Sequence, residues 1–162
     1  MNQKCQTILD SQEQLIVTIN DEALVTVNET FLDFFAVDSV EDFKETYRFS
    51  CIGETFNAKS PEGYIHIMEG RERWIDYILS RSFENNHKVI ITRETTDFVF
   101  SVSAAKLPGE EGLKSAVFTD ITEMEKAKLN LETVTDAIQD LIFYKDMDLK
   151  FIGVNEACSK FF

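Results

Sequence analysis

The sequence has 162 residues, of which 44% are hydrophobic and 28% are charged, and it is long enough to bury one core. Its 16 basic and 29 acidic residues give a formal net charge of −13, so its surface repels nucleic-acid phosphates and anionic lipid. We therefore expect neither nucleic acid nor direct membrane contact as partners. No apolar run reaches the length of about 18–20 residues that a membrane span needs, and the three cysteines are odd in number and widely spaced. A reducing, cytoplasmic location fits these features best.

The N-terminal part predicts a short helix, a strand hairpin and two further helices. The first helix is expected over residues 4–13, and the apolar runs QLIVTI and ALVTV read as strands joined by the turn NDE. Asn28 then stands where its side chain can cap a helix, and Ser39 can cap the next one. The helix after Asn28 carries three phenylalanines on one face: Phe31, Phe34 and Phe35.

Beyond an irregular stretch over residues 51–70, the sequence predicts one more helix and three strands. RERWIDYILSRS is an amphipathic helix over residues 71–82. The strands are HKVIITR, FVFSVSAAKL and LKSAVFTDI, and the second shows the clearest alternation of two side-chain sets, from Phe98 to Ala105. Strands that follow one another through short turns pair antiparallel, with the helices on one face. The predicted fold class is therefore α+β.

The segment TDITEMEKAKLNLETVTDAI predicts a connector helix over residues 123–138. It begins with a capping box, because the Thr122 hydroxyl can accept from the Glu125 amide while the Glu125 carboxylate reaches back. Apolar residues then recur at spacings of three and four, which is the pattern of a coiled-coil seam. A homodimer held along this seam is one interpretation, and an amphipathic helix lying on its own domain is the other. The seam residues are Met124, Ala127, Leu131, Val134 and Ile138.

The end of the chain resembles its beginning. VNETFLDFF over residues 27–35 reappears as VNEACSKFF over residues 154–162, and the apolar runs before them match at a shift of 126 or 127 positions. A shift of this size is about one domain length, whereas repeats of about 20–50 residues indicate a solenoid. We interpret residues 1–122 as one domain, 123–138 as the connector and 139–162 as the start of a second domain of the same kind. The alternative is that strand–turn–strand–helix segments resemble one another by composition alone.

The order of elements, with the chain running from DIT straight into an amphipathic helix, resembles a PAS domain over about residues 8–122. The resemblance is carried by Val27-Asn28-Glu29, the phenylalanine face, the long strand from Phe98 and the Asp120-Ile121-Thr122 end. The sequence looks most similar to PAS modules of bacterial sensor histidine kinases and diguanylate cyclases, where such modules stand in tandem upstream of an output enzyme. The resemblance implies a five-stranded antiparallel sheet in the order 2-1-5-4-3 with helices covering a pocket on one face. It also implies signal relay through Asp120, Ile121, Thr122 and Glu125.

Members of this family hold flavin, haem, small carboxylates or nothing, so local residues have to decide the cofactor. Flavin photosensing uses an Asn-Cys-Arg-Phe-Leu-Gln motif, but here Arg48-Phe49 stands before Cys51, and Cys51 reads as a small buried hydrophobe. Haem would need an axial ligand. His66 lies in GYIHIMEG, where haem-binding relatives place theirs, whereas His87 opens a strand and reads as exposed or capping. We expect no cofactor and no metal, with haem on His66 and flavin as the less favoured alternatives.

The sequence carries no phosphate-binding loop, Cys/His cluster, serine elbow, phosphoacceptor histidine helix or GGDEF-type motif, so we expect no catalysis by this chain. One hypothesis is a sensory input module that binds a small molecule and passes movement along the connector helix to a kinase or cyclase output domain. The other is a structural relay and dimerisation module whose interior is filled by its 14 phenylalanines. The expected pocket lining is Tyr64, Trp74, Ile78, Phe100, Val102 and Phe118, with Arg93 as a further contact.

Residues 141–162 supply two strands and the start of a helix, and a lone hairpin is marginal in water. We expect the apolar residues of this segment to pack on another surface, first of all a second copy of the chain. Folding back onto the first domain is the alternative.

Overall fold

The structure is a computed structural model that describes residues 3–20, 23–70, 72–81, 87–109 and 112–161. It divides into two compact units, residues 1–121 and residues 122–162, and each unit is described by itself. The helix expected as a separate connector thus belongs to the same unit as the C-terminal hairpin. In the described part of the chain, no helix combines the length and the apolar character needed to cross a membrane.

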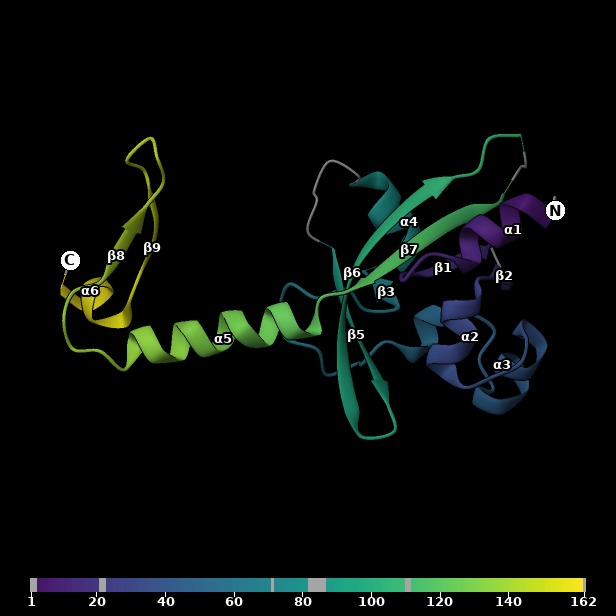
Figure 1. The fold of residues 1–162 in the computed structure, drawn as a ribbon, viewed down its shortest axis with the longest axis horizontal. Helices are drawn as coiled ribbons and strands as arrows, with labels where there is room; N and C mark the ends of the chain where they lie inside the picture. Colours follow the sequence, from purple (N-terminus) through teal and green to yellow (C-terminus); the bar gives the residue numbers. More distant parts are fainter. Residues whose placement is uncertain (1–2, 21–22, 71, 82–86, 110–111, 162) are drawn as a thin grey trace. The chain divides into compact units, whose positions relative to one another are not determined.

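The first unit is built on one five-stranded antiparallel sheet (Figure 1). Its strands are β1 (Leu15–Ile19), β2 (Leu24–Val27), β5 (Lys88–Arg93), β6 (Thr96–Lys106) and β7 (Lys114–Asp120). They lie in the order β2-β1-β7-β6-β5, so the last strand is the central one. Counted among these five strands alone, this is the predicted order 2-1-5-4-3. The α+β prediction is confirmed, and the first unit has the PAS topology.

One face of this sheet carries the core. In β1, Leu15, Val17 and Ile19 are buried, whereas the residues between them are half-buried. The register places Leu15 opposite Phe118 and Val17 opposite Ala116 of β7, so buried residues of neighbouring strands stand side by side. The alternation of buried and half-buried residues gives the sheet one apolar face, against which the helices pack. The other strands bury Val89, Ile91, Phe100 and Val102.

Short helices cover the apolar face. They are α2 (Glu29–Phe35), α3 (Val40–Tyr47), the 3-10 helix η1 (Ile52–Thr55) and α4 (Trp74–Ser80), whereas α1 (Gln3–Asp10) contacts α2. The predicted caps of α2 and α3 are confirmed, because the Asn28 side chain accepts from the Phe31 amide and the Ser39 hydroxyl accepts from the Asp42 amide.

Helix α4 is shorter than the predicted span of residues 71–82. It begins at Trp74 because the two residues before it form β4 (Glu72–Arg73), which pairs with β3 (Met68–Glu69). An ion pair between Lys114 Nζ of β7 and Asp76 Oδ1, at 2.9 Å, joins α4 to the sheet. Trp74 therefore enters the core directly from a strand end.

A single buried side chain joins three elements of the first unit. The Oδ1 atom of Asn28 accepts from the amides of Ile16 at 2.9 Å and Phe31 at 3.3 Å. Its Nδ2 atom donates to the carbonyls of Leu9 at 3.1 Å and Gln14 at 2.9 Å. One amide group thus satisfies backbone groups at the end of α1, at β1 and at the start of α2. Asn28 with these four partners is called the asparagine hub.

The second unit consists of a long helix, a hairpin and a short helix. The elements are α5 (Thr122–Asp136), β8 (Phe143–Lys145), β9 (Phe151–Val154) and α6 (Glu156–Phe161). Because α5 ends at Asp136, Ile138 lies beyond the helix, contrary to its predicted place on a helical seam. The remaining seam residues lie on α5 and are exposed: Met124, Ala127, Leu131 and Val134.

Replacing Asn28 with alanine would leave two amides and two carbonyls without their partner. Because a buried group left unpaired costs about 1–3 kcal/mol and the surroundings relax in part, we expect Asn28→Ala to lower the free energy of unfolding by about 3 kcal/mol. Urea unfolding followed by the fluorescence of Trp74, the single tryptophan, measures this change in the first unit. The control Asn20→Ala removes an exposed side chain that accepts from the Ala23 amide, and we expect a loss below about 1 kcal/mol. Equal losses would contradict the importance of the asparagine hub.

Candidate functional site

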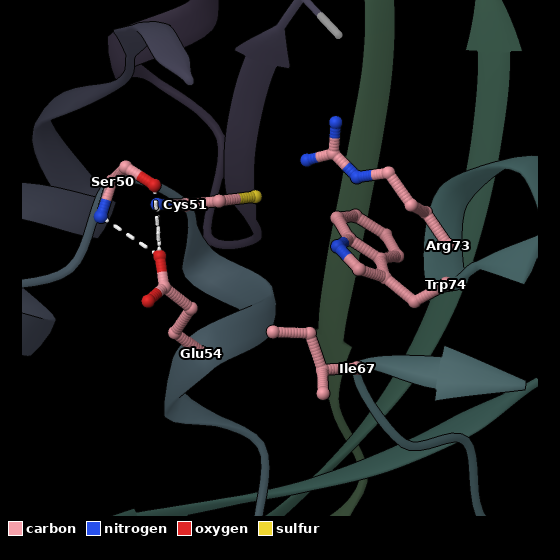
Figure 2. A pocket seen from close by; sticks show the side chains of 6 residues that line it. All are labelled: Ser50, Cys51, Glu54, Ile67, Arg73 and Trp74. Carbon is pink, nitrogen blue, oxygen red and sulfur yellow. Dashed lines mark hydrogen bonds between the residues drawn. The ribbon is translucent and has the colours of Figure 1, made fainter. Parts of the chain in front are cut away.

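A pocket of about 400 Å³ lies where η1 meets the start of α4 (Figure 2). The chain between α3 and η1 forms one side, and the junction of β4 with α4 forms the other. In Figure 2 the indole of Trp74 and the guanidinium of Arg73 both point toward the side that carries Cys51 and Glu54. The lining residues are Ser50, Cys51, Glu54, Ile67, Arg73 and Trp74.

The turn over residues 50–54 has a fixed shape because Glu54 bonds back to its start. The Glu54 Oε1 atom accepts from the Ser50 amide at 2.8 Å, the Ser50 hydroxyl at 2.9 Å and the Cys51 amide at 3.1 Å. These amides precede a helix and have no partner within it, so the carboxylate satisfies them. Cys51 is buried, as predicted.

This turn and the residues after it are bonded to both edge strands of the sheet. The Ser50 carbonyl accepts from the Leu24 amide of β2 at 2.9 Å. The Asn57 amide donates to the Ile90 carbonyl of β5 at 2.7 Å. A movement of the turn would therefore act on β2 and β5 together.

Trp74 is enclosed by its neighbours. Its amide donates to the Ile67 carbonyl at 3.1 Å, and its ring centroid lies 5.4 Å from that of Phe56 and 5.8 Å from that of Phe118. Gly53 lies against another edge of the ring, since a Cβ atom there would come within 2.5 Å of Trp74 Cδ1 and Nε1. This close approach requires a residue without a side chain at position 53.

The indole N–H of Trp74 is buried and has no hydrogen-bond partner among the described residues. Most buried donors in folded proteins have a partner, and one without a partner costs about 1–3 kcal/mol. The Nε1 edge faces the turn over residues 50–54 (Figure 2), and Arg73 lines the same pocket. The site thus brings a guanidinium and an unpaired N–H close together, and both can bind an acceptor oxygen.

The structure divides the predicted lining residues between this pocket and the core. Trp74 lines the pocket, and Tyr64 is half-buried and forms an isolated bridge with Lys88. The others are buried in the hydrophobic core: Ile78, Phe100, Val102 and Phe118.

Sequence patterns did not point to Ser50, Glu54 or Arg73, because the alternation of the strands draws attention to the sheet face. The pocket instead lies at a junction of short helices, where no periodicity exists. The spacing from Cys51 to Glu54, which matches a capping box, is the signal that could have located the turn.

Aromatic rings fill much of the space between the sheet and helices α2 and α3. The ring centroids of Phe31, Phe35 and Phe43 lie 4.7–5.2 Å from one another. Arg93, expected as a ligand contact, donates to the Phe34 carbonyl, and its guanidinium lies 5.0 Å from the centre of the Phe34 ring. Arg93 therefore links β5 to α2 and lies outside the pocket lining.

The two histidines do not fit a histidine-ligated haem in this pocket. His87, expected to be exposed or capping, is buried, and its Nε2 atom lies 3.1 Å from the carbonyl oxygen of Arg81, the C-cap residue of α4. His66 is half-buried and, like His87, does not line the pocket. Over the described ranges, no three His, Cys, Asp or Glu residues are grouped so that they could hold a metal ion.

No protein-family model matches the sequence, and no curated protein matches it. The solved structures that are similar to the chain include a PAS domain from a two-component sensor histidine kinase, with 13% identity and a TM-score of 0.43, covering 72% of this chain and 93% of that chain. They also include a Light-Oxygen-Voltage domain studied with a flavin analogue, with 17% identity and a TM-score of 0.46, covering 83% of this chain and 97% of that chain. The fold assignment rests on the strand order of the sheet and not on these values.

A methyl group added at Gly53 would collide with the indole. We expect Gly53→Ala to lower the free energy of unfolding by about 2 kcal/mol, because overpacking a filled site displaces its neighbours. The displaced ring should also emit at longer wavelength, since it moves toward water. Gly63→Ala is the control: its Cβ would meet nothing within 4 Å, and only its φ of +89° carries a cost, of about 1–2 kcal/mol. An unchanged emission spectrum in Gly53→Ala would contradict this packing.

Proposed function

We propose that the first unit is a sensory module that binds a small molecule with a carboxylate or carbonyl oxygen in the pocket beside Trp74. The observation that carries this proposal is the buried, unpaired indole N–H next to Arg73. An acceptor oxygen would supply the missing partner, and a guanidinium can bind a carboxylate through two parallel bonds. Cys51 and Ile67 supply an apolar part of the lining and suit a short apolar part of the same molecule, while Ser50 and Glu54, which also line the pocket, bond to each other.

Ligand entry requires a small movement of the turn over residues 50–54, because Gly53 lies against the Nε1 edge of Trp74. The bonds from Ser50 to β2 and from Asn57 to β5 would carry this movement to both edges of the sheet. The ligand would thus favour one arrangement of the turn by binding it better than the other.

The route out of the first unit is proposed to run through the end of β7. Asp120 is exposed, and the Ile121 amide donates to the Val99 carbonyl of β6 at 2.8 Å, which ties this end to the sheet. We propose that Asp120, Ile121, Thr122 and Glu125 relay the movement into α5. On the PAS resemblance alone, the proposed output is a histidine kinase or diguanylate cyclase domain, and the role of this chain is binding, not turnover.

A structural relay without a ligand is the second candidate, favoured by the aromatic packing between the sheet and helices α2 and α3. In this case the pocket is a surface hollow, and the indole N–H stays unpaired at a cost of about 1–3 kcal/mol. The two candidates differ in whether any small molecule changes the surroundings of Trp74.

Trp74 is the single tryptophan, so its fluorescence reports on the pocket directly. We expect members of a panel of small carboxylates and 2-oxo acids to change its emission in a saturable way. The same compounds should raise the midpoint of thermal unfolding, because a ligand that binds only the folded state stabilises it. Arg73→Gln should weaken binding at least about tenfold, since it removes a charge-assisted bond worth about 1.5–3 kcal/mol.

Arg81→Gln is the matched control, because Arg81 pairs with Glu72 at 3.2 Å and lies outside the pocket lining. The Arg81→Gln variant should bind the same compounds with the affinity of the unchanged protein. An absorption spectrum, in which we expect neither flavin nor haem bands, accompanies the titration. If no compound changes the emission, or if both arginine variants weaken binding equally, the structural relay is the better account.

We also propose that α5 pairs with α5 of a second copy. Met124, Leu131 and Val134 are each 61% exposed although they are apolar, and they recur on one side of the helix. Packing this stripe against its own copy would remove it from water, as in a coiled coil.

Leu131→Glu should weaken the dimer at least about tenfold, because it places charges in the seam of both helices. Sedimentation velocity over a range of concentrations measures the dissociation constant. Leu129→Glu is the control, since Leu129 is 63% exposed on α5 but lies off the seam. A chain that stays monomeric at the highest concentration would contradict the dimer.

A further inference from the structure

The second unit contains a second asparagine hub. Asn155 is buried, as Asn28 is. Its Oδ1 atom accepts from the amides of Ile142 and Cys158, both at 3.0 Å. Its Nδ2 atom donates to three carbonyls, those of Thr135 and Ile138 at 3.1 Å and that of Asp140 at 2.9 Å. One amide group thus joins the end of α5, the start of the hairpin and the start of α6.

The partners occupy equivalent places in the two units. Each partner of the first hub has a counterpart in the second at a shift of 126 or 127 positions. The pairs are Leu9 and Thr135, Gln14 and Asp140, Ile16 and Ile142, and Phe31 and Cys158. One more bond is shared, because the Glu29 amide donates to Asp10 Oδ1 at 3.0 Å and the Glu156 amide donates to Asp136 Oδ1 at 2.8 Å. Similar composition alone does not produce the same bonds at equivalent atoms.

The apolar residues of the two hairpins differ in burial. In the first unit Leu15, Val17 and Leu24 are 3%, 0% and 1% exposed. At the same places in the second unit Leu141, Phe143 and Phe151 are 44%, 54% and 65% exposed. A cluster of large apolar residues left in water marks a binding surface.

The two hairpins also differ at one edge. Strand β1 pairs with β2 on one side and with β7 on the other. Within the described part of the chain, β8 pairs with β9 alone. The open edge of β8 offers amides and carbonyls to a further strand. By analogy with β7, the strand that fits is antiparallel and carries apolar residues at alternate positions.

The apolar face of the second hairpin, beside the open edge of β8, contains a hollow. The Phe143 and Phe151 rings lie 5.5 Å apart and help to line a hollow of about 540 Å³. The hollow is completed by Val154, Cys158 and Ser159. The strands of the second unit carry larger residues than those of the first, with Phe143 in place of Val17 and Phe151 in place of Leu24. The helix carries a smaller one, with Cys158 in place of Phe31. Such compensating exchanges keep the volume of a core while changing its shape.

We propose that residues 122–162 are the opening part of a second PAS fold, whose open edge and apolar face bind a polypeptide of the same kind as residues 36–121. That polypeptide supplies a three-stranded antiparallel meander with an apolar inner face, as β5, β6 and β7 do in the first unit. Pairing of two identical hairpins would also shelter the phenylalanines, but it would not account for the repeated hub bonds. The inference concerns the second unit alone and does not depend on ligand binding in the first.

The test is a chain extended after Phe162 by a second copy of residues 36–121. Phe162 corresponds to Phe35, so the added residues continue the sequence as the first unit does. Hydrogen exchange followed by mass spectrometry compares the β8 and β9 amides in the original and extended chains. We expect exchange of the β8 amides to slow at least about 100-fold in the extended chain, because the strand gains a partner and a core. Binding of the dye ANS, which reports exposed apolar surface, should fall in parallel.

Two variants of the extended chain provide the controls. Phe143→Asp combined with Phe151→Asp removes the apolar face, and we expect the protection to be lost. Met147→Asp, at a residue that is 99% exposed in the same hairpin, should leave the protection intact. The proposal is overturned if the extension does not protect β8, or if the protection survives the double substitution. Protection of β8 in the original chain that increases with its concentration would also overturn it, because a second copy would then cover the face.

Discussion

The buried side-chain amide of Asn28 fixes the relation between the first helix, the first strand and the helix that follows the hairpin. It carries two acceptor sites and two donor hydrogens, and all of them are used within the fold. The bond to the Phe31 amide sets the start of α2, and the bond to the Ile16 amide sets the position of β1 beneath it. Phe31 and Val17 are both fully buried in the same core cluster.

The same packing explains where the candidate site lies. Phenylalanine rings of α2 and α3 pack on one another, whereas a hollow lies at the junction of η1 and α4. There Gly53 lies against the edge of the Trp74 ring, and the buried indole N–H has no acceptor among the described residues. A local departure from full hydrogen bonding within an otherwise consistent core is typical of functional positions.

The two units share the asparagine hub and the hairpin, but the hairpin is buried in the first unit and exposed in the second. Both hubs tie the end of a helix to a hairpin, and in both an aspartate at the helix end accepts from the amide that follows the asparagine. Val17 is buried because β7 and the helices cover it, whereas Phe143, at the equivalent place, remains exposed. Burial of the hairpin is therefore set by distant strands and not by the hairpin itself.

The sequence by itself determined the features that depend on near neighbours. The cap at Asn28, the cap at Ser39 and the alternation in β6 follow from spacing along the chain, and the strand order followed from the PAS resemblance that these features support. Trp74, which the sequence predicts to line a pocket, borders the hollow beside η1.

Only the tertiary structure decided features that depend on residues far apart in the chain. The pairing of β3 with β4 sets the start of α4 at Trp74, and the fold buries His87 against the carbonyl of the α4 C-cap residue Arg81. The pocket required Ser50 and Arg73, which are far apart in the sequence, to line one hollow, and the position of Gly53 against the Trp74 ring follows from the packing of η1 on α4. Spacing along a chain constrains a residue's own helix or strand, whereas access to a hydrogen-bond partner depends on which other segment packs against it.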